Sequence, residues 1–278
     1  MIDLRGKPIA ITGASSGIGR AAAVACAGAG MPVALAARRV EKLRTAVDEI
    51  TRAGGRAIAV PTDVDRPEDC RALVDRTVTE FGSIHAVFAN AGYGFEKPMH
   101  RTSDAEVRAI FETNFFGTLS TIRPALERML AAGSGHILVC SRCLSKVGIP
   151  FLGPYSATKA AQDHIARAMR GELAGSGIAV SSVHPIGTRT EFFEQVGVRS
   201  GPDEGSLHTP ELFMQPPERV ARAIVRRLRS GRGGEVWTSN TVRLTFAFLN
   251  AFPSLGDWVI ARYAAKQRRD RDRAGKPR

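Results

Sequence analysis

Hydrophobic residues in this chain gather in short, nearly continuous runs, and longer segments with helical periodicity separate these runs. The runs predict strands at "PIAIT" (8–12), "VALAA" (33–37), "RAIAVPT" (56–62), "HAVFAN" (85–90), "HILVC" (136–140), "IAVSSVHP" (178–185) and "GEVWT" (234–238). The segments between them, such as "GRAAAVACAGAG" and "RPEDCRALVDRTVTEFG", carry apolar residues at helical spacing. Strands that are apolar on both sides are typical of a parallel sheet that helices cover on both faces. The pattern therefore predicts an α/β fold with one doubly wound parallel sheet.

Nothing in the sequence divides this pattern into two separate cores. No linker rich in Pro, Gly or Ser and no internal repeat interrupts it. A chain of 278 residues with 44% hydrophobic residues can bury a sizeable core as one unit. We therefore predict a main domain over residues 1–240 and a C-terminal amphipathic helical extension with a basic tail over residues 241–278.

Composition favours a reducing compartment and offers no metal site. Four cysteines in this length do not make a disulfide framework, so we expect a cytoplasmic protein. Cys140 and Cys143 form a C-x-x-C, but no second ligand pair accompanies them, and we expect no metal there. The N-terminus lacks the long apolar run of a signal peptide, and no stretch reaches the ~18 uninterrupted apolar residues of a membrane span. These features predict a soluble protein.

The net charge of +12 lies largely near the C-terminal end of the chain. It is not spread along one face, as it is in many nucleic-acid-binding proteins. The tail "KQRRDRDRAGKPR" also contains no aromatic residue on which a base could stack. We expect a solvated tail and no nucleic-acid partner.

The turn after the first predicted strand has the composition of a dinucleotide-binding site. In "TGASSGIG", Gly13 permits a tight turn, Gly17 lets the backbone approach a pyrophosphate, and Gly19 lets the following helix pack onto the sheet. The free N–H groups and the dipole at the start of that helix attract phosphate. A glycine cluster alone is weak evidence, but one placed between a strand and a helix in the first βα unit is strong. The residues expected to contact the cofactor here are Gly13, Ser15, Ser16, Gly17, Ile18 and Gly19.

The residues after the second predicted strand favour NADP over NAD. An NAD site places an acidic residue about 20 residues beyond the glycines, where it binds the 2′-hydroxyl of the ribose. This chain has "AARR" at that point, and Arg38 and Arg39 are suited to a 2′-phosphate. Alternatively, both arginines simply begin a solvated helix, and NAD(H) remains possible.

Five motifs together give the chain a family resemblance. "TGASSGIG", Asp63-Val64, "NAG", Asn114 in "ETNFFG" and "YSATK" occur in the order and at the spacings of the short-chain dehydrogenase/reductase family, which the chain resembles over residues 5–240. The resemblance implies a Rossmann-type sheet of seven strands, a nicotinamide cofactor and hydride transfer between a carbonyl and an alcohol. It also implies cofactor contacts at Asp63, Val64, Asn90, Ala91 and Gly92, and at Pro185, Gly187, Thr188 and Thr190 of "PIGTRT". Ile186 stands in that last stretch where the family usually has glycine.

Tyr155 and Lys159 are the predicted catalytic pair. Reduction of a ketone needs a hydride from the cofactor and a proton for the developing alkoxide. Tyr155 can donate that proton, and the Lys159 ammonium, one helical turn away, favours the phenolate that remains. Lys159 can also bind the nicotinamide ribose. The resemblance assigns Asn114 the holding of a water that links Lys159 to solvent.

Arg142 occupies the position where the resemblance requires a serine that binds the substrate carbonyl. Ser141 is its neighbour, but consecutive residues of a strand face opposite sides, and Ser145 lies in the following loop. Loss of one such donor typically lowers turnover ~10²–10³-fold. An arginine is nevertheless a strong cationic donor that could stabilise an alkoxide or recruit an acidic substrate. We predict that the Arg142 side chain points into the pocket beside the Tyr155 hydroxyl.

Three functions remain open from the sequence. The first is an NADP(H)-dependent oxidoreductase acting on a carbonyl or secondary alcohol, and the second is a cofactor-binding protein with little catalysis because of Arg142. The third is a peripheral membrane protein with lipid-like substrates. The segment 191–216 should cover the substrate pocket, and its apolar residues suggest an apolar substrate, although such residues often only pack a lid. These residues are Phe192, Phe193, Leu212, Phe213 and Met214.

Residues 241–263 carry apolar side chains at helical spacing across a break at Pro253. The positions are Leu244, Phe248, Leu249, Phe252, Leu255, Trp258, Val259 and Arg262. With the basic tail that follows, they could form an amphipathic membrane contact. We favour packing on the protein's own body or on a second subunit, because most apolar helix stripes are buried in protein. We expect a homo-oligomer, either a dimer or a tetramer.

Overall fold

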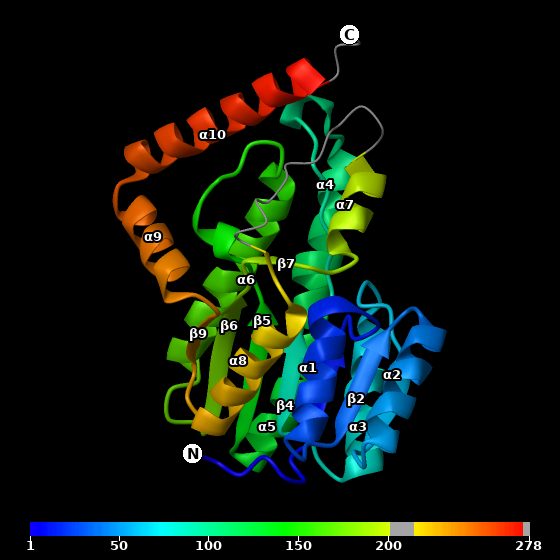
Figure 1. Ribbon diagram of the computed structural model, residues 1–278. Helices are drawn as coiled ribbons and strands as arrows, with labels where there is room; N and C mark the ends of the chain where they lie inside the picture. The colour runs from blue at the N-terminus through cyan, green and yellow to red at the C-terminus, as the bar shows by residue number, and fades with distance from the viewer. Residues whose placement is uncertain (201–213, 275–278) are drawn as a thin grey trace.

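A seven-stranded parallel sheet forms the centre of the molecule. The computed structural model describes residues 1–200 and 214–274 (Figure 1). The strands are β1 (Ile9–Thr12), β2 (Val33–Ala37), β3 (Ala57–Pro61), β4 (Ala86–Ala89), β5 (Gly135–Cys140), β6 (Ile178–His184) and β9 (Gly234–Trp237). Their order in the sheet is β3-β2-β1-β4-β5-β6-β9. The α/β fold and all seven predicted strands are therefore confirmed.

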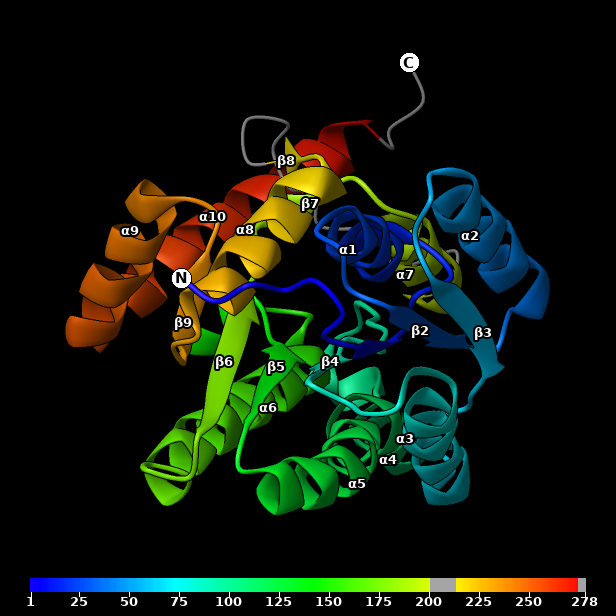
Figure 2. The same ribbon diagram turned by 90° about the horizontal axis from the view of Figure 1, so that it is seen from below.

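Helices cover both faces of this sheet, as Figure 2 shows from below. One face packs against α1 (Gly17–Gly28), α2 (Val40–Arg52) and α8 (Pro217–Ser230), and the other packs against α3 (Pro67–Phe81), α5 (Gly117–Ala132) and α6 (Gly153–Glu172). Each layer has its own apolar cluster, and strand residues alternate between the two: Ile9 and Ile11 belong to the first, and Ala10 belongs to the second. Burial on both faces explains why the strands are almost wholly apolar.

The strand order reverses direction at β1, which has β2 on one side and β4 on the other. At such a switch point, the connections leave the carboxyl edge in opposite directions and open a crevice in which α/β proteins bind ligands. The loops that follow β1, β2, β4, β5 and β6 all emerge at this edge. The fold therefore brings the glycine turn and the Tyr155 region to one cleft.

Shorter elements at the carboxyl edge complete the cleft. They are η1 (Met99–Arg101), α4 (Asp104–Phe111), the π-helix η2 (Glu112–Phe116), the 3₁₀-helix η3 (Cys143–Lys146), α7 (Phe192–Ser200) and the two-residue strands β7 (Gly187–Thr188) and β8 (Met214–Gln215). β7 and β8 pair with each other in parallel. Phe192 and Phe193 begin α7, whereas Leu212 and Phe213 of the predicted lid lie outside the described residues.

The C-terminal extension forms two helices, α9 (Asn240–Ala251) and α10 (Pro253–Ala274), which break at Pro253 as predicted. Figure 1 shows α9 leaving the sheet beside β9 and α10 crossing beyond its carboxyl edge. The prediction was that the apolar side chains pack on the protein's own body or on a second subunit; most of them do not pack on the protein's own body, and packing on a second subunit stays a prediction. Six are at least 40% exposed, namely Leu244, Phe248, Phe252, Leu255, Trp258 and Val259.

Hydropathy gives one further result for these helices. Among the described residues, no single helix has both the length and the apolar content needed to cross a bilayer. The pair formed by α9 and the first part of α10 reaches that content together, but the two helices meet at a bend of 115°.

Candidate active site

The glycine turn between β1 and α1 forms one end of the cleft. Gly13 and Gly17 have φ of +67° and +55°, which favour glycine. A side chain at Gly13 would lie 2.9 Å from the Ala91 backbone, and one at Gly17 would lie equally close to Thr190. The N–H groups of Asn90 and Ala91 donate to the Thr12 hydroxyl. The turn is thus held closely against the loop that follows β4, and backbone lines this end of the cleft.

Arg39 is fixed at the same end by four polar contacts. Its guanidinium donates to the Ser15 and Ser16 hydroxyls and pairs with Glu191 at 2.7 Å. Glu191 also pairs with Lys42, and hydrogen bonds from Lys42 and Arg39 lower the pKa of this carboxyl group to about 2. Glu191 was not predicted from the sequence as a site residue. Its contacts connect the basic residues after β2 to the start of α7.

Arg38 is exposed and lines the cleft, and it has no ion-pair partner among residues 1–200 and 214–274. The two predicted 2′-phosphate ligands thus differ. Arg39 is already held by protein groups, whereas Arg38 is available to a ligand. An anion bound here would have to compete with the Glu191 carboxylate for Arg39.

The cleft has a volume of about 440 Å³ and brings together most of the predicted cofactor contacts. It is lined by Gly13, Ser15, Ser16, Gly17, Ile18, Arg38, Arg39, Asp63, Val64, Asn90, Ala91, Gly92, Tyr155, Lys159, Pro185, Thr188 and Thr190. Gly19 and Gly187 are not among the lining residues, and both are buried. These two glycines therefore support the wall from behind.

Tyr155 and Lys159 lie at the other end of the cleft, one turn apart near the start of α6. Both are 4% exposed. The Lys159 ammonium donates to the Cys140 carbonyl at 2.9 Å and lies 5.7 Å from the centre of the Tyr155 ring. The end of β5 thus anchors the lysine, and its charge remains beside the phenol.

Asn114 lies behind this pair in the π-helix η2 and is fully buried. Its amide nitrogen donates to the Tyr93 carbonyl and to Thr158, and its amide oxygen accepts from the Tyr93 N–H. The backbone carbonyl of Asn114 accepts a hydrogen bond from the side-chain amide of Gln162 at 2.6 Å. These contacts join the loop after β4 to α6. The water-holding role that the resemblance implies for Asn114 stays a prediction.

Arg142 reaches the catalytic end from the end of β5, as predicted. One guanidinium nitrogen, Nη1, lies 3.4 Å from the Tyr155 hydroxyl. The guanidinium carbon lies 5.6–5.8 Å from the ring centres of Tyr155, Phe192 and Phe193. Burial lowers the pKa of Arg142, but attraction to Tyr155, Cys143 and Glu96 outweighs this effect and the net pKa is raised. The arginine is therefore a cation enclosed by aromatic faces next to the predicted proton donor.

Neither nearby serine takes the place that Arg142 fills. The Ser141 hydroxyl is 1% exposed and donates to the Lys159 carbonyl at 2.8 Å, so it holds the backbone of α6. Ser145 is buried in η3 and does not line the cleft. Among the described residues, Arg142 is the polar group from this segment that approaches Tyr155.

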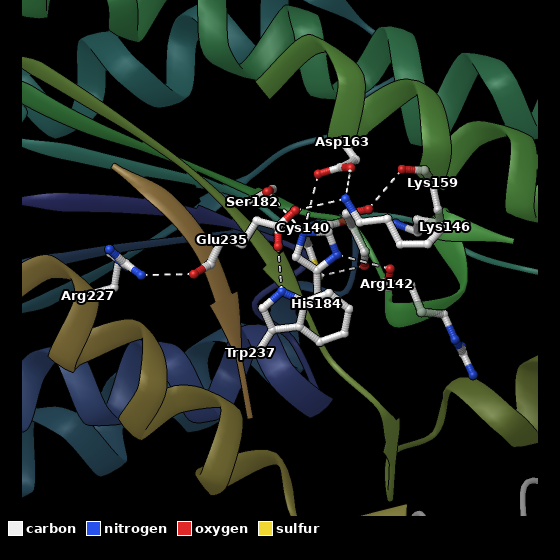
Figure 3. A network of polar contacts seen from close by, with 11 residues as sticks. Cys140, Arg142, Lys146, Lys159, Asp163, Ser182, His184, Arg227, Glu235 and Trp237 are labelled. Carbon is white, nitrogen blue, oxygen red and sulfur yellow. Dashed lines mark hydrogen bonds and ion pairs between the residues drawn. The ribbon is translucent and has the colours of Figure 1, made fainter. Parts of the chain in front are cut away.

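A buried polar network behind the site supports the backbone of Arg142 (Figure 3). The Lys146 ammonium lies 2.6 Å from Asp163 and 2.8 Å from Glu235, and His184 lies 3.3 Å from the other Asp163 oxygen. Burial tends to raise the pKa of Asp163, but hydrogen bonds with His184 and Lys146 lower it overall. The second ring nitrogen of His184, Nδ1, contacts the Arg142 carbonyl at 3.2 Å. This chain of contacts fixes the segment from which the guanidinium extends.

The same network contains the one cluster of metal-ligand type in the described part of the chain. Ligand atoms of Asp163, His184 and Glu235 lie within 4.8 Å of one another. The Lys146 ammonium is bonded to both carboxylates and already supplies the positive charge that a metal ion would bring. The sequence did not indicate this cluster, because its three residues come from three separate elements, α6, β6 and β9.

Known proteins match the chain over most of its length. The family model described as short chain dehydrogenase matches residues 7–199. An A-factor type gamma-butyrolactone 1′-reductase of Streptomyces virginiae is 35% identical over 77% of this chain and 84% of its own. The crystal structure of a short-chain type dehydrogenase/reductase from Mycobacterium marinum is 33% identical, with a TM-score of 0.76 over 84% of this chain and 94% of that one. An alcohol dehydrogenase of Thermococcus sibiricus complexed with 5-hydroxy-NADP is 28% identical, with a TM-score of 0.73 over 82% and 94% of the two chains.

Proposed function

The chain belongs to the short-chain dehydrogenase/reductase family, and we propose that it is an NADP(H)-preferring oxidoreductase that interconverts a carbonyl compound and an alcohol. One observation carries this proposal: a single cleft has the glycine turn at one end and the Tyr155–Lys159 pair at the other. Hydride transfer needs a dinucleotide site and a proton donor at one place, and the cleft offers both.

The residues of the cleft fit a nicotinamide dinucleotide. The glycine turn and the start of α1 would hold the pyrophosphate, because backbone N–H groups and the helix dipole converge there. Arg38 and Arg39 would hold the 2′-phosphate of NADP, and Arg38 lines the cleft without an ion pair to any residue that the structure describes. Asn90, Ala91 and Gly92 would lie along the middle of the cofactor. The bound cofactor would supply or accept the hydride.

The protein's own groups would manage the proton. Tyr155 would donate it to the substrate oxygen during reduction and would take it back during oxidation. Lys159, fixed by the Cys140 carbonyl, would stabilise the phenolate through its charge. Phe192 and Phe193 would help to exclude water from the reacting oxygen, since Phe192 packs 5.6 Å from the Tyr155 ring.

The position of Arg142 supports a restriction on which carbonyl compounds this activity accepts. In place of a small neutral donor, the chain offers a bulky cation beside Tyr155. We propose that neutral carbonyls are turned over weakly for this reason, whereas cofactor binding, which uses the other end of the cleft, is unaffected. A cofactor-binding protein without catalysis is the second candidate, and Arg142 is the observation that favours it.

The experiment is a panel of neutral and anionic ketones, aldehydes and secondary alcohols, assayed with NADPH, NADP, NADH and NAD by nicotinamide absorbance. Turnover with any member supports the oxidoreductase. Tight cofactor binding without turnover across the panel would support the second candidate.

The exposed face of α9 and α10 supports a further proposal about location. We propose that the protein is cytoplasmic and that this face touches an anionic membrane surface. The exposed apolar side chains lie beside Arg243, Arg262 and Lys266, and the basic tail follows them. Apolar residues flanked by basic ones favour the interface of an anionic bilayer.

A further inference from the structure

We infer that the physiological substrate is a 2-oxo acid or its 2-hydroxy acid, and that Arg142 binds its carboxylate. This inference rests on the proposed oxidoreductase function and names the substrate class of that site. The observation that carries it is a guanidinium in the catalytic end of the cleft to which no described carboxylate is paired, since Glu96 attracts it only from beyond ion-pair distance. Among residues 1–200 and 214–274, no carboxylate lies within ion-pair distance of Arg142.

The hydrogen-bonding capacity of Arg142 is largely unused. A guanidinium has five N–H donors, and the described contacts employ one of them, in the long 3.4 Å contact with Tyr155. Its Nε is buried and has no acceptor among the described residues. Faces of aromatic rings attract a cation, but they do not satisfy donors as oxygen atoms do. The site therefore holds the charge in place and leaves its donors to a ligand.

The neighbouring Lys146 shows how this fold treats a structural cation. Lys146 lies four residues along the chain and is paired with both Asp163 and Glu235. Within the described part of the chain Arg142 forms no such ion pair, although a buried charge without a paired partner is costly. Glu191 lines the same cleft, but its carboxylate pairs with Arg39 and Lys42 at the cofactor end. An anionic substrate would supply the negative charge that pairs with Arg142.

Two further positive charges line the catalytic end of the cleft, whereas Glu96, which attracts Arg142, is not among the lining residues. Lys159 lies inside the cleft, and Arg199, at its rim, stacks on the Tyr93 ring at 4.2 Å. A concave site lined by one sign of charge raises the local concentration of ligands of the opposite sign. The aromatic rings of Tyr93, Phe192 and Phe193 line the same region and suit an apolar substituent.

The short distance between Arg142 and Tyr155 indicates where the carboxylate lies relative to the carbonyl. A carbonyl oxygen that accepts the Tyr155 proton would lie beside Arg142, because Nη1 is 3.4 Å from the Tyr155 oxygen. A carboxylate on the adjacent carbon would meet the remaining guanidinium donors in the forked geometry that arginine prefers. In the reduction, C2 of the 2-oxo acid gains a hydride from NADPH and its oxygen gains the Tyr155 proton. The products are the 2-hydroxy acid and NADP⁺, and solvent returns the proton to Tyr155.

A matched pair of substrates tests this inference. Benzoylformate and methyl benzoylformate share the ketone and the ring, but only the first is an anion. With saturating NADPH, we expect kcat/KM for the acid to exceed that for the ester by at least ~10-fold in the unmodified protein. Arg142→Ser should lower kcat/KM for the acid by ~30-fold or more and raise that for the ester by ~10-fold. Arg142→Met, which keeps an unbranched side chain without charge or hydrogen-bond donors, should also lower kcat/KM for the acid.

Two further measurements keep this inference separate from the proposed function. Calorimetric binding of benzoylformate to the protein–NADP⁺ complex should weaken by ~10-fold or more in both variants, whatever the turnover. Arg76→Ser, which removes an exposed cation on α3 that does not line the cleft, should change this binding by less than ~3-fold. Equal use of acid and ester by the unmodified protein, or unchanged binding in the Arg142 variants, would overturn the inference. Absence of turnover with both substrates and across the whole carbonyl panel would count against the oxidoreductase, while the binding result would still decide the role of Arg142.

Discussion

Replacing Tyr155 by phenylalanine removes one hydroxyl and leaves the ring that packs against Phe192. The variant should lose the proton donor and nearly all turnover, while NADPH affinity should stay within ~3-fold, because most predicted cofactor contacts lie elsewhere in the cleft. Steady-state kinetics with the best substrate and a fluorescence titration with NADPH measure the two quantities. Turnover above ~10% of the original rate would show that another group donates the proton.

Arg38 and Arg39 should set the preference for NADPH. Replacing both by alanine should weaken the binding of NADPH by ~10–100-fold, since charge-assisted hydrogen bonds to the 2′-phosphate are lost. The affinity for NADH should be nearly unchanged. Arg44→Ala is the matched control, because Arg44 lies on α2, which begins directly after these two arginines, and pairs only with Glu41 among the described residues. Titration of all three proteins with both cofactors gives the dissociation constants. Equal affinity of the unmodified protein for NADPH and NADH would contradict this prediction.

Residue-scale prediction from the sequence worked where a motif is local. The glycine turn and the Tyr155–Lys159 pair are short stretches whose backbone conformation brings their own members together. The contacts of Glu191 and the network around Lys146 could not be found in this way. They join residues up to 152 positions apart, and charge at one position does not reveal its partner at another.

At the scale of elements, apolar runs identified every strand of the central sheet because each strand is buried on both faces. β7 and β8 were missed, since two residues carry no periodicity. The π-helix η2 was also missed, because one extra residue in a helical turn leaves the apolar pattern almost unchanged. The apolar side chains of α9 and α10 are largely exposed, and the sequence of one chain does not state which lipid or protein surface they contact.

The exposed face of α9 and α10 leads to a prediction at this scale. The double variant Phe248→Ser, Trp258→Ser should lose co-sedimentation with vesicles that contain phosphatidylserine, because both side chains are more than half exposed and available to lipid. The unmodified protein should bind phosphatidylcholine vesicles more weakly, since its basic residues then lack an anionic partner.

Leu130→Ser is the control for this variant, because Leu130 is a similarly exposed apolar residue on α5. Deletion after residue 240 should reproduce the loss of vesicle binding and leave the sheet folded. If the double variant instead dissociates an oligomer in sedimentation velocity and leaves vesicle binding unchanged, a second copy covers this face and the membrane proposal is wrong.

At the scale of the whole molecule, the sequence predicted one doubly wound sheet, and the strand order explains why distant motifs meet. The glycine turn and Tyr155 are separated by more than 130 residues, yet both follow strands that end at the same edge. Parallel connectivity alone requires this convergence. The charge of the cleft does not follow from connectivity, because it depends on which charged side chains form ion pairs in the folded protein.

Acid should destabilise the whole molecule below a pH of about 6.5. Burial lowers the pKa of His136 to about 3 and that of His85 to about 4, and both lie at the amino edge of the sheet, away from the active site. The unfolded chain binds a proton at each histidine near pH 6.5 while the folded protein does not, so stability is complete above that pH and falls as the pH decreases. For His136, which is 1% exposed, the loss is on the order of 1 kcal/mol per pH unit.

Urea unfolding at pH 7, 6 and 5 measures this dependence. The lowered pKa values of Asp163, Glu106 and Glu191 affect stability mainly below about pH 5, where the unfolded carboxyl groups begin to bind protons, so the range from pH 7 to 5 reports chiefly the histidines. His136→Asn has no side chain that titrates here and can keep a hydrogen bond to Ser181, so its free energy of unfolding should depend less steeply on pH. His164→Gln, on the exposed side of α6, should keep the original slope. If His136→Asn also keeps that slope, burial of the neutral imidazole is not the cause of the acid sensitivity.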